Sequence, residues 1–360
     1  MTEQKIPLLS FFTGGGFLDI GFLQAGFDVV WTNDCNDEFS NARIPAMRGM
    51  RFDSEPCHNP NSIRRVRPEE ILGQAFHSSQ TRPPVFGVIG GPPCPDFSVA
   101  GKQRGGTGDN GSLSAIYVER ILALRPTFFV FENVPGLVRT QKHKEFLDDL
   151  LCSLGWVYNC EFKILNSLEY GVPQDRERVF IIGFELSWLL SRPSGAPTLF
   201  KWPVPKYPNA KASFDWPRRS PFGGAPQKPQ GIPDELMAGP VVCDQGQLAT
   251  LPNGTEWFTP FSSKFQVIDE GDDSHKSFKR LHRWRYSPTA SYGNNEVHLH
   301  PTEPRRLSVR EALRLQTVPD EYALPPGMPL THKFKMICNG VPVKLAYEVA
   351  MGVRKFMLSD

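Results

Sequence analysis

The sequence lacks the paired cysteines that build zinc sites and disulfide frameworks. Its seven cysteines are scattered, odd in number and never spaced as C-x-x-C, so we expect a reduced, cytoplasmic protein without a bound metal. It also lacks an uninterrupted apolar run of about 18 residues, the length that a membrane-spanning helix needs. The short apolar stretch near its start runs directly into the glycines at 14–16. We therefore expect neither secretion nor a membrane partner.

Net charge is also low, at +2 for a chain of 360 residues. A charge of this size is compatible with nucleic acid but does not indicate it, so any surface that binds a polyanion must be local. The chain does have an ordinary globular composition, with 40% hydrophobic and 22% charged residues. Its length predicts one large domain and a smaller one.

Short apolar runs alternate with amphipathic stretches in the first half of the chain, which is typical of a parallel sheet covered by helices. Strands are predicted at Ile6–Phe11, Val29–Trp31, Val85–Ile89, Thr127–Phe131 and Arg178–Ile182. Helices are predicted at Leu18–Ala25, Leu113–Leu124 and Lys144–Leu154, where apolar residues recur at three- and four-residue steps. The fold class predicted is therefore a Rossmann-like α/β domain.

Proline, tryptophan and glycine then crowd residues 192–240, and the helical period is lost. It returns at Leu307–Leu315 and Lys344–Val353. We predict that residues 1–189 form the first part of the α/β domain, that residues 190–300 form a smaller inserted domain, and that residues 301–360 return to the first domain.

Chemistry-bearing residues follow three of the predicted strands. Phe12-Thr13-Gly14-Gly15-Gly16 follows the first strand, where glycines let a ligand approach the backbone, and Asp34 after the second strand could bind a ribose diol. The dinucleotide fingerprint G-x-G-x-x-G fails because Asp19 occupies its last position. A tight turn without a ligand is the plain alternative.

Cys94 lies in the segment Gly90-Gly91-Pro92-Pro93-Cys94-Pro95, directly after an apolar strand. A lone cysteine is usually a small buried hydrophobe, but the flanking prolines and glycines favour a rigid turn that presents the thiol. Glu132, in the segment Val130-Phe131-Glu132-Asn133-Val134, comes directly after the predicted strand Thr127–Phe131, where desolvation should raise its pKa toward the range useful for proton donation. The alternative is a strand-end glutamate that faces water.

Together these motifs resemble the bacterial DNA cytosine-5 methyltransferase family over nearly the whole chain, and they occur in that family's order. FTGGG resembles its cofactor loop, GGPPCPDFS its nucleophile loop and FENVPGL its glutamate motif. Gln174–Arg178 resembles its Q-x-R-x-R motif, Arg306–Gln316 its R-x-L-T-x-R-E-x-x-R-L-Q helix and Asn339–Pro342 its G-N-x-V-P turn. The resemblance implies an S-adenosylmethionine-dependent methyltransferase domain with an inserted target-recognition domain at 190–300.

The resemblance implies roles for particular residues. Cys94 matches the nucleophile that attacks carbon 6 of cytosine, Glu132 the acid at ring nitrogen 3, and Arg178 the cation at the 2-carbonyl oxygen, with Arg176 as support. The implied S-adenosylmethionine contacts are Phe12, Gly14, Gly16, Asp34, Pro93, Leu113, Asn339 and Val341. The chain departs from the family pattern at Asn61-Ser62-Ile63, where an acidic residue is usual, at Pro95 in place of glutamine, and at Cys338 in place of glycine.

The substrate implied is double-stranded DNA with its target cytosine turned out of the helix. Lys102, Gln103 and Arg104 lie among glycines in a segment suited to grip phosphates, and Lys279 and Arg283 lie in a basic cluster of the inserted domain. The alternative for the glycine-rich segment is a solvated surface loop. The alternative for the basic cluster is a solvated basic face. We expect a cytoplasmic, nucleoid-associated monomer, accompanied in a restriction-modification system by an endonuclease of the same specificity.

Three other functions remain open on the sequence alone. The nearest is a tRNA cytosine-5 methyltransferase, although the inserted domain of more than a hundred residues favours DNA. The second is a catalytically silent nucleic-acid-binding module, which the presence of Cys94, Glu132 and Arg178 disfavours. The third is an NAD-dependent oxidoreductase, which the broken dinucleotide fingerprint disfavours.

Overall fold

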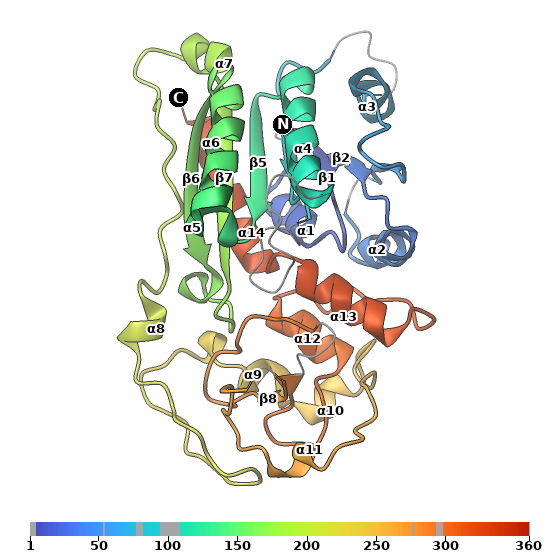
Figure 1. Cartoon of the computed structure of the whole chain (residues 1–360), viewed down its shortest axis with the longest axis vertical. Helices are drawn as coiled ribbons and strands as arrows, with labels where there is room; N and C mark the ends of the chain where they lie inside the picture. Colours follow the sequence, from blue (N-terminus) through green and yellow to red (C-terminus); the bar gives the residue numbers. More distant parts are fainter. Residues whose placement is uncertain are drawn as a thin grey trace.

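The computed structural model describes residues 5–52, 55–76, 82–93, 109–275, 277–292 and 298–359. Its upper lobe in Figure 1 is built on one seven-stranded sheet with the strand order β3-β2-β1-β4-β5-β7-β6. The strands are β1 (Pro7–Phe11), β2 (Asp28–Asn33), β3 (Cys57–Asn59), β4 (Gly87–Gly90), β5 (Phe128–Asn133), β6 (Tyr158–Asn166) and β7 (Glu177–Glu185). The predicted Rossmann-like α/β arrangement is confirmed.

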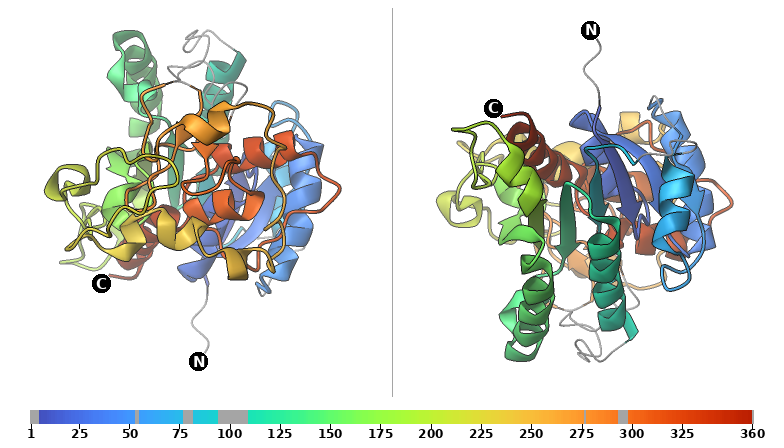
Figure 2. Two further views of the ribbon diagram at one scale, coloured as in Figure 1. Left: turned by 90° about the horizontal axis from the view of Figure 1, so that it is seen from below. Right: turned by 90° about the horizontal axis from the view of Figure 1, so that it is seen from above.

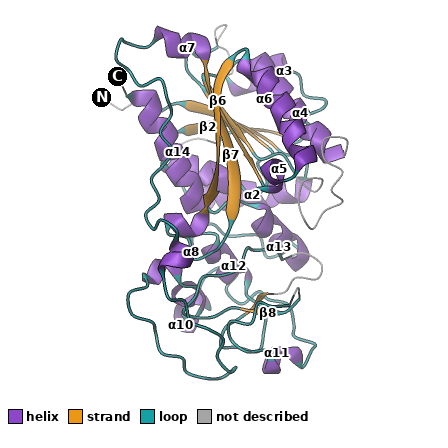
Figure 3. Ribbon diagram, turned by 60° about the vertical axis from the view of Figure 1, so that its left-hand side comes forward, coloured by secondary structure: helices purple, strands orange, loops and turns teal. Residues whose placement is uncertain are grey.

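Helices cover both faces of this sheet because its central strands are apolar on both sides. On one face lie α1 (Phe17–Gln24) and α14 (Val343–Leu358), which pack against each other. On the other face lie α3 (Pro68–Ala75), α4 (Asp109–Leu124) and α6 (Gln141–Gly155). Figure 3 shows the sheet between these two helix layers. The predicted helices at Leu18–Ala25, Leu113–Leu124 and Lys144–Leu154 are confirmed, although α4 and α6 begin a few residues earlier.

The sheet is not parallel throughout, so that part of the prediction is wrong. Strand β7 runs antiparallel to both β5 and β6. Strand β6 was not predicted, because it is an edge strand with few buried side chains, and Phe162 in its middle is 48% exposed. Its amphipathic sequence therefore lacks the apolar run that marks the central strands.

The lower lobe is made of loops and short elements. These are η2 (Ser167–Tyr170) and α8 (Ala210–Ser213) beside the sheet lobe, then η3 (Asp234–Leu236), α9 (Gly239–Val242), α10 (Gln245–Leu248), α11 (Lys264–Val267), β8 (Lys279–Arg280) and β9 (His298–Leu299). Seen from below, the segments coloured yellow to orange lie across one end of the sheet lobe (Figure 2). Phe200 still packs against the core of β7 and α14, so contacts with the first lobe continue beyond residue 190.

Three further helices join the lobes, and two short ones flank β5 and β7. Helices α12 (Val309–Leu315) and α13 (Leu330–Asn339) form a shared apolar cluster with α1 and α2 (Asp37–Gly49). The short helices are α5 (Gly136–Arg139) and α7 (Leu186–Ser191). Helix α12 begins with a capping box. The Ser308 hydroxyl accepts a hydrogen bond from the Glu311 N–H, and the Glu311 carboxylate accepts one from the Ser308 N–H. Across the described residues, no helix combines the length and the apolar character needed to cross a membrane.

Candidate active site

The turn between β1 and α1 has an unusual backbone. Phe12, Gly14 and Gly16 all have positive φ, at 53°, 52° and 75°. Glycine adopts this region without strain, whereas Phe12 is held there by its surroundings, and such outliers cluster at functional sites. The Gly14 N–H donates to Asp34 Oδ2 at 2.7 Å, and Asp34 Oδ1 accepts from the Asn36 N–H at 2.8 Å. The predicted glycine turn and Asp34 therefore meet at the carboxyl ends of β1 and β2.

Distant segments converge on the same turn. The Tyr322 hydroxyl donates to the Gly15 carbonyl at 2.8 Å, and a Cβ on Gly340 would lie 2.2 Å from the Phe17 ring. Asn339 at the end of α13 is exposed beside this contact, while the Val341 side chain is buried. The Phe12 ring lies edge-on to Tyr117 of α4, with ring centroids 5.8 Å apart. Leu113, one turn earlier on α4, is partly buried, and Pro93 is exposed.

Glu132 and Arg178 form a buried ion pair where β5 ends and β7 begins. Arg178 Nε lies 3.0 Å from Glu132 Oε1, and each side chain is 11% exposed. The antiparallel pairing of β5 with β7 creates this contact, because it places Glu132 opposite Phe180, two residues along the strand from Arg178. Burial raises the pKa of the Glu132 carboxyl, and Arg178 and Arg176 oppose that shift.

The segment that leads to Cys94 lies directly against this pair. A Cβ on Gly91 would be 2.6 Å from Glu132 Oε2, so only glycine lets the carboxylate approach this backbone. The Asn133 side-chain amide donates to the Pro92 carbonyl at 3.3 Å. The end of β4 is thereby fixed beside Glu132. Cys94 itself and Lys102, Gln103 and Arg104 lie outside the described residues.

Arg176 is fully buried and connects three separate parts of the chain. Its guanidinium donates to the carbonyls of Ala290, Cys338 and Gly340 at 3.1, 2.7 and 2.9 Å. Burial lowers its pKa, and three carbonyl oxygens compensate for the lost hydration of the cation. Arg176 therefore holds the lower lobe and the Asn339–Pro342 turn against the start of β7.

Sequence reasoning missed Gln174 at this junction and Tyr322 beside the turn after β1. Gln174 is completely buried, donates to the Leu315 carbonyl at 3.2 Å and accepts from the Ala290 N–H at 3.0 Å. Its place at the head of the Gln174–Arg178 motif was a usable signal. Tyr322 carried no signal of its own, because only the tertiary structure brings its hydroxyl to Gly15.

The two predicted DNA contacts of the inserted domain have different surroundings. Arg283 is paired with Glu270, a fully buried carboxylate, with Nη2 and Oε2 at 2.7 Å, and it also donates to the Gly224 carbonyl. This gives Arg283 an internal role in the lower lobe. Lys279 opens β8 and is partly buried. The adjacent Arg280 is buried and donates to the carbonyls of Phe265, Ile268, His300 and Glu303.

Comparison with known proteins identifies the chain. The sequence model of the C-5 cytosine-specific DNA methylases matches residues 6–355. The chain belongs to this family. The resemblance in its motifs is thus confirmed, and the protein is a DNA (cytosine-5) methyltransferase.

Relatives of this methyltransferase cover nearly its whole length. It is 42% identical to the Type II methyltransferase M.NmeDI of Neisseria meningitidis serogroup C, over 99% of this chain and 85% of that protein. It is 31% identical to M.MthTI of Methanothermobacter thermautotrophicus, over 98% of each chain. The fold is similar to that of the S. pombe Dnmt2 methyltransferase, with a TM-score of 0.60 over 98% of this chain and 99% of that one, at 12% identity.

Proposed function

We propose that this methyltransferase transfers the methyl group of S-adenosylmethionine to carbon 5 of a cytosine turned out of double-stranded DNA at a specific sequence. The observation that carries the proposal is the buried Glu132–Arg178 pair, which lies against Gly91, three residues before Cys94. A base stacked in the duplex hides the ring atoms that must react, so the cytosine has to leave the helix first.

The proposed reaction starts at Cys94, whose thiolate adds to carbon 6 of the cytosine. The electron pair of the carbon 5–carbon 6 double bond shifts toward nitrogen 3, which Glu132 protonates, and Arg178 stabilises the charge on the 2-carbonyl oxygen. Carbon 5 would then take the methyl group that bound S-adenosylmethionine supplies, with S-adenosylhomocysteine as the leaving group. Loss of the carbon 5 proton to a base restores the carbon 5–carbon 6 double bond and expels the Cys94 thiolate, and nitrogen 3 returns its proton to the Glu132 carboxylate.

The surroundings of Glu132 support its role as the acid. Burial favours the protonated carboxyl, which a general acid requires, while the contact of Arg178 Nε with Glu132 Oε1 at 3.0 Å keeps the group in one orientation. Arg176 supports this site through the carbonyl groups that it holds, rather than by contact with the reacting base.

The turn after β1 has the features that an S-adenosylmethionine site needs. Gly14 and Gly16 leave the backbone open at positive φ, and Asp34 is a partly exposed carboxylate beside them. Each Asp34 oxygen already accepts one N–H and keeps a second lone pair for a ribose hydroxyl. The proposed contacts are Phe12, Gly14, Gly16, Asp34, Pro93, Leu113, Asn339 and Val341.

Residues 190–300 are proposed to recognise the DNA sequence. Lys279 is proposed to contact phosphates. Arg283 is proposed to stabilise the domain through Glu270 and to lie next to the bound DNA. Lys102, Gln103 and Arg104 are proposed to grip the backbone around the target base. The relatives named Type II methyltransferases support a place in restriction-modification. A monomer acting on the nucleoid in the cytoplasm, with an endonuclease that recognises the same site, fits that role.

Bisulfite sequencing of DNA from cells that express the protein tests this proposal. The host should lack cytosine-5 methylation, and cells expressing Cys94→Ser are the matched control. We expect methylated cytosines within one short sequence only in cells with the unaltered enzyme. Unmethylated DNA alongside newly methylated tRNA would replace the proposal with the tRNA reaction.

A further inference from the structure

Two charged residues are buried beneath the turn proposed to bind the cofactor, and the proposed reaction uses neither. Asp19 in the first turn of α1 and Arg43 in α2 are each 2% exposed. Burying a charge costs free energy unless it is paired or hydrogen-bonded. Among the described residues, Asp19 Oδ2 and Arg43 Nε have no hydrogen-bond partner. A buried pair that is only partly satisfied points to a functional constraint.

The Arg43 side chain packs against the turn at Gly16. A Cβ on Gly16 would lie 3.1 Å from Arg43 Cδ, so the arginine stem supports the last glycine of the turn. The guanidinium is held from the sheet side, where Nη2 donates to the Thr32 hydroxyl at 3.3 Å and to His58 Nδ1 at 3.2 Å. Because a guanidinium can only donate, His58 Nδ1 must be the acceptor.

Asp19 links the strand before the turn, β1, to the helix after it, α1. The Ser10 hydroxyl donates to Asp19 Oδ1 at 2.6 Å, which joins the residue before the turn to the first helical turn after it. The second Asp19 oxygen has no hydrogen-bond partner among the described residues, and the positive charge of Arg43 stabilises the ionised carboxylate and so opposes the rise of its pKa. The pair thus connects β1 and α1 to α2, and through Thr32 and His58 to β2 and β3.

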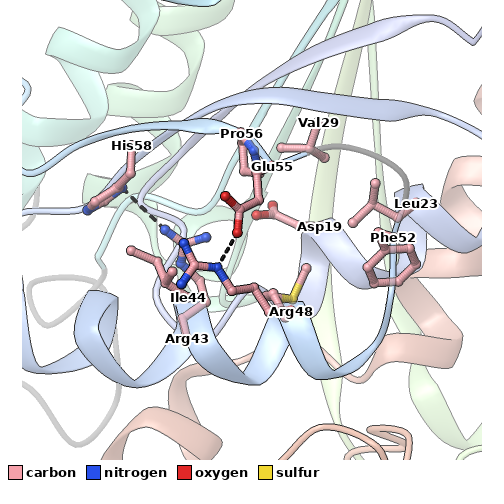
Figure 4. A pocket seen from close by; sticks show the side chains of 11 residues that line it. Asp19, Leu23, Val29, Arg43, Ile44, Arg48, Phe52, Glu55, Pro56 and His58 are labelled. Atoms are coloured by element: carbon pink, nitrogen blue, oxygen red, sulfur yellow. Dashed lines mark hydrogen bonds and ion pairs between the residues drawn. The ribbon is translucent and has the colours of Figure 1, made fainter.

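The space behind Asp19 and Arg43 is not closely packed. A cavity of ≈ 380 Å³ lies between α1, α2, β2 and β3, and both Asp19 and Arg43 line it. Figure 4 shows Asp19 reaching it from α1 and Arg43 from α2, with the Arg48–Glu55 pair nearby. Protein interiors are normally filled to high density. Asp19 and Arg43 therefore border a space that apolar side chains do not fill.

We propose that Asp19 and Arg43 are positioning residues that hold the Phe12–Gly16 turn in its cofactor-binding conformation. This inference rests on the proposed S-adenosylmethionine site. It predicts that changes to the pair alter cofactor affinity more than the rate of the chemical step, because the proposed reaction gives neither residue a role.

The inference also predicts a dependence on pH. Burial raises the pKa of the Asp19 carboxyl to about 6, while Ser10 and Arg43 oppose the shift. Asp19 is therefore ionised at pH 7.5, and it loses its attraction for Arg43 as the pH falls through 6. The groups that face the pair are His58 from β3, Tyr322 ahead of α13, and Arg48 and Glu55 at the cavity. Since His58 also gains a proton in acid, an Asp19 variant is needed to separate the two.

The test is calorimetric titration of the full-length enzyme with S-adenosylmethionine between pH 5.5 and 7.5. We expect Asp19→Asn and Arg43→Met to weaken binding about tenfold at pH 7.5, within the range usual for coupled sites. Arg43→Lys should recover most of the affinity. Binding by the unaltered enzyme should weaken as the pH falls through 6, whereas binding by Asp19→Asn should change little. With saturating cofactor, kcat should be nearly unchanged.

Glu55→Gln is the matched control, because Glu55 lines the same cavity but pairs with Arg48 at the exposed rim. Unchanged cofactor affinity in folded Asp19→Asn and Arg43→Met would overturn the inference. If these variants do not fold, a flat pH profile of the unaltered enzyme would overturn it as well. Failure of the unaltered enzyme to bind S-adenosylmethionine would overturn the cofactor assignment and this inference with it.

Discussion

Replacing Gly91 with alanine tests the active-site geometry with one methyl group. The added Cβ would lie 2.6 Å from Glu132 Oε2, whereas ordinary contacts begin at 3.4 Å, so the carboxylate must retreat by 0.8 Å. Gly91 is not among the glycines with positive φ, so the alanine backbone itself is unstrained. Retreat is hindered because Glu132 is buried and paired with Arg178. The substitution therefore displaces the proposed acid rather than the fold.

We expect Gly91→Ala to slow the chemical step by roughly ten- to a hundredfold, since a 1 Å misplacement of a reacting group can cost that much. This equals about 1.4–2.7 kcal/mol in the barrier. Overpacking should also lower the free energy of unfolding by about 1–3 kcal/mol. Single-turnover methylation at saturating cofactor measures the first effect, and thermal melting measures the second. Cofactor affinity should change little.

Gly73→Ala is the matched control, because a Cβ there meets no atom within 4 Å. The double variant Gly91→Ala/Glu132→Gln shows where the effect arises. If the alanine acts through Glu132, Gly91→Ala should slow methylation far less when Glu132 is already glutamine than it does in the otherwise unaltered enzyme. A Gly91→Ala enzyme that methylates at the unaltered single-turnover rate would refute the reasoning, and an undiminished loss in the double variant would assign the effect to another group.

The other predictions concern the proposed catalytic groups and the recognition domain. Cys94→Ser should abolish methyl transfer while DNA and cofactor binding persist, because the hydroxyl is not ionised near neutral pH; DNA with 5-fluorocytosine at the target should trap the unaltered enzyme covalently, as seen by denaturing electrophoresis. Glu132→Gln should slow single-turnover methylation about a hundredfold. Burial raises the pKa of Glu132. The methylation rate of the unaltered enzyme should therefore fall as the pH rises above that pKa, because the protonated form of Glu132 is depleted. The glutamine variant should lose this dependence on pH. Exchanging residues 190–300 with those of a relative should change the methylated sequence found by bisulfite sequencing; retention of the original target would place recognition elsewhere.

The sequence by itself determined the local elements and the order of the functional motifs. Apolar runs bounded by glycine and proline mark β1, β4 and β5, because strands buried on both faces must be apolar throughout. The side chains that follow such strands are expected at one edge of the sheet, so the sequence alone predicts that the glycine turn and Glu132 face one cleft.

Only the tertiary structure decided which partners these residues have. The antiparallel direction of β7 gives Glu132 its contact with Arg178, and no local pattern encodes the direction in which a strand returns. Arg176 and Arg283 look alike as basic residues in the sequence, yet one holds three carbonyls and the other a buried glutamate. Asp19 and Arg43 read as ordinary helix-surface charges until folding buries them under Gly16. Periodicity reports which face of an element is buried, whereas the identity of the partner depends on contacts between residues far apart in the chain.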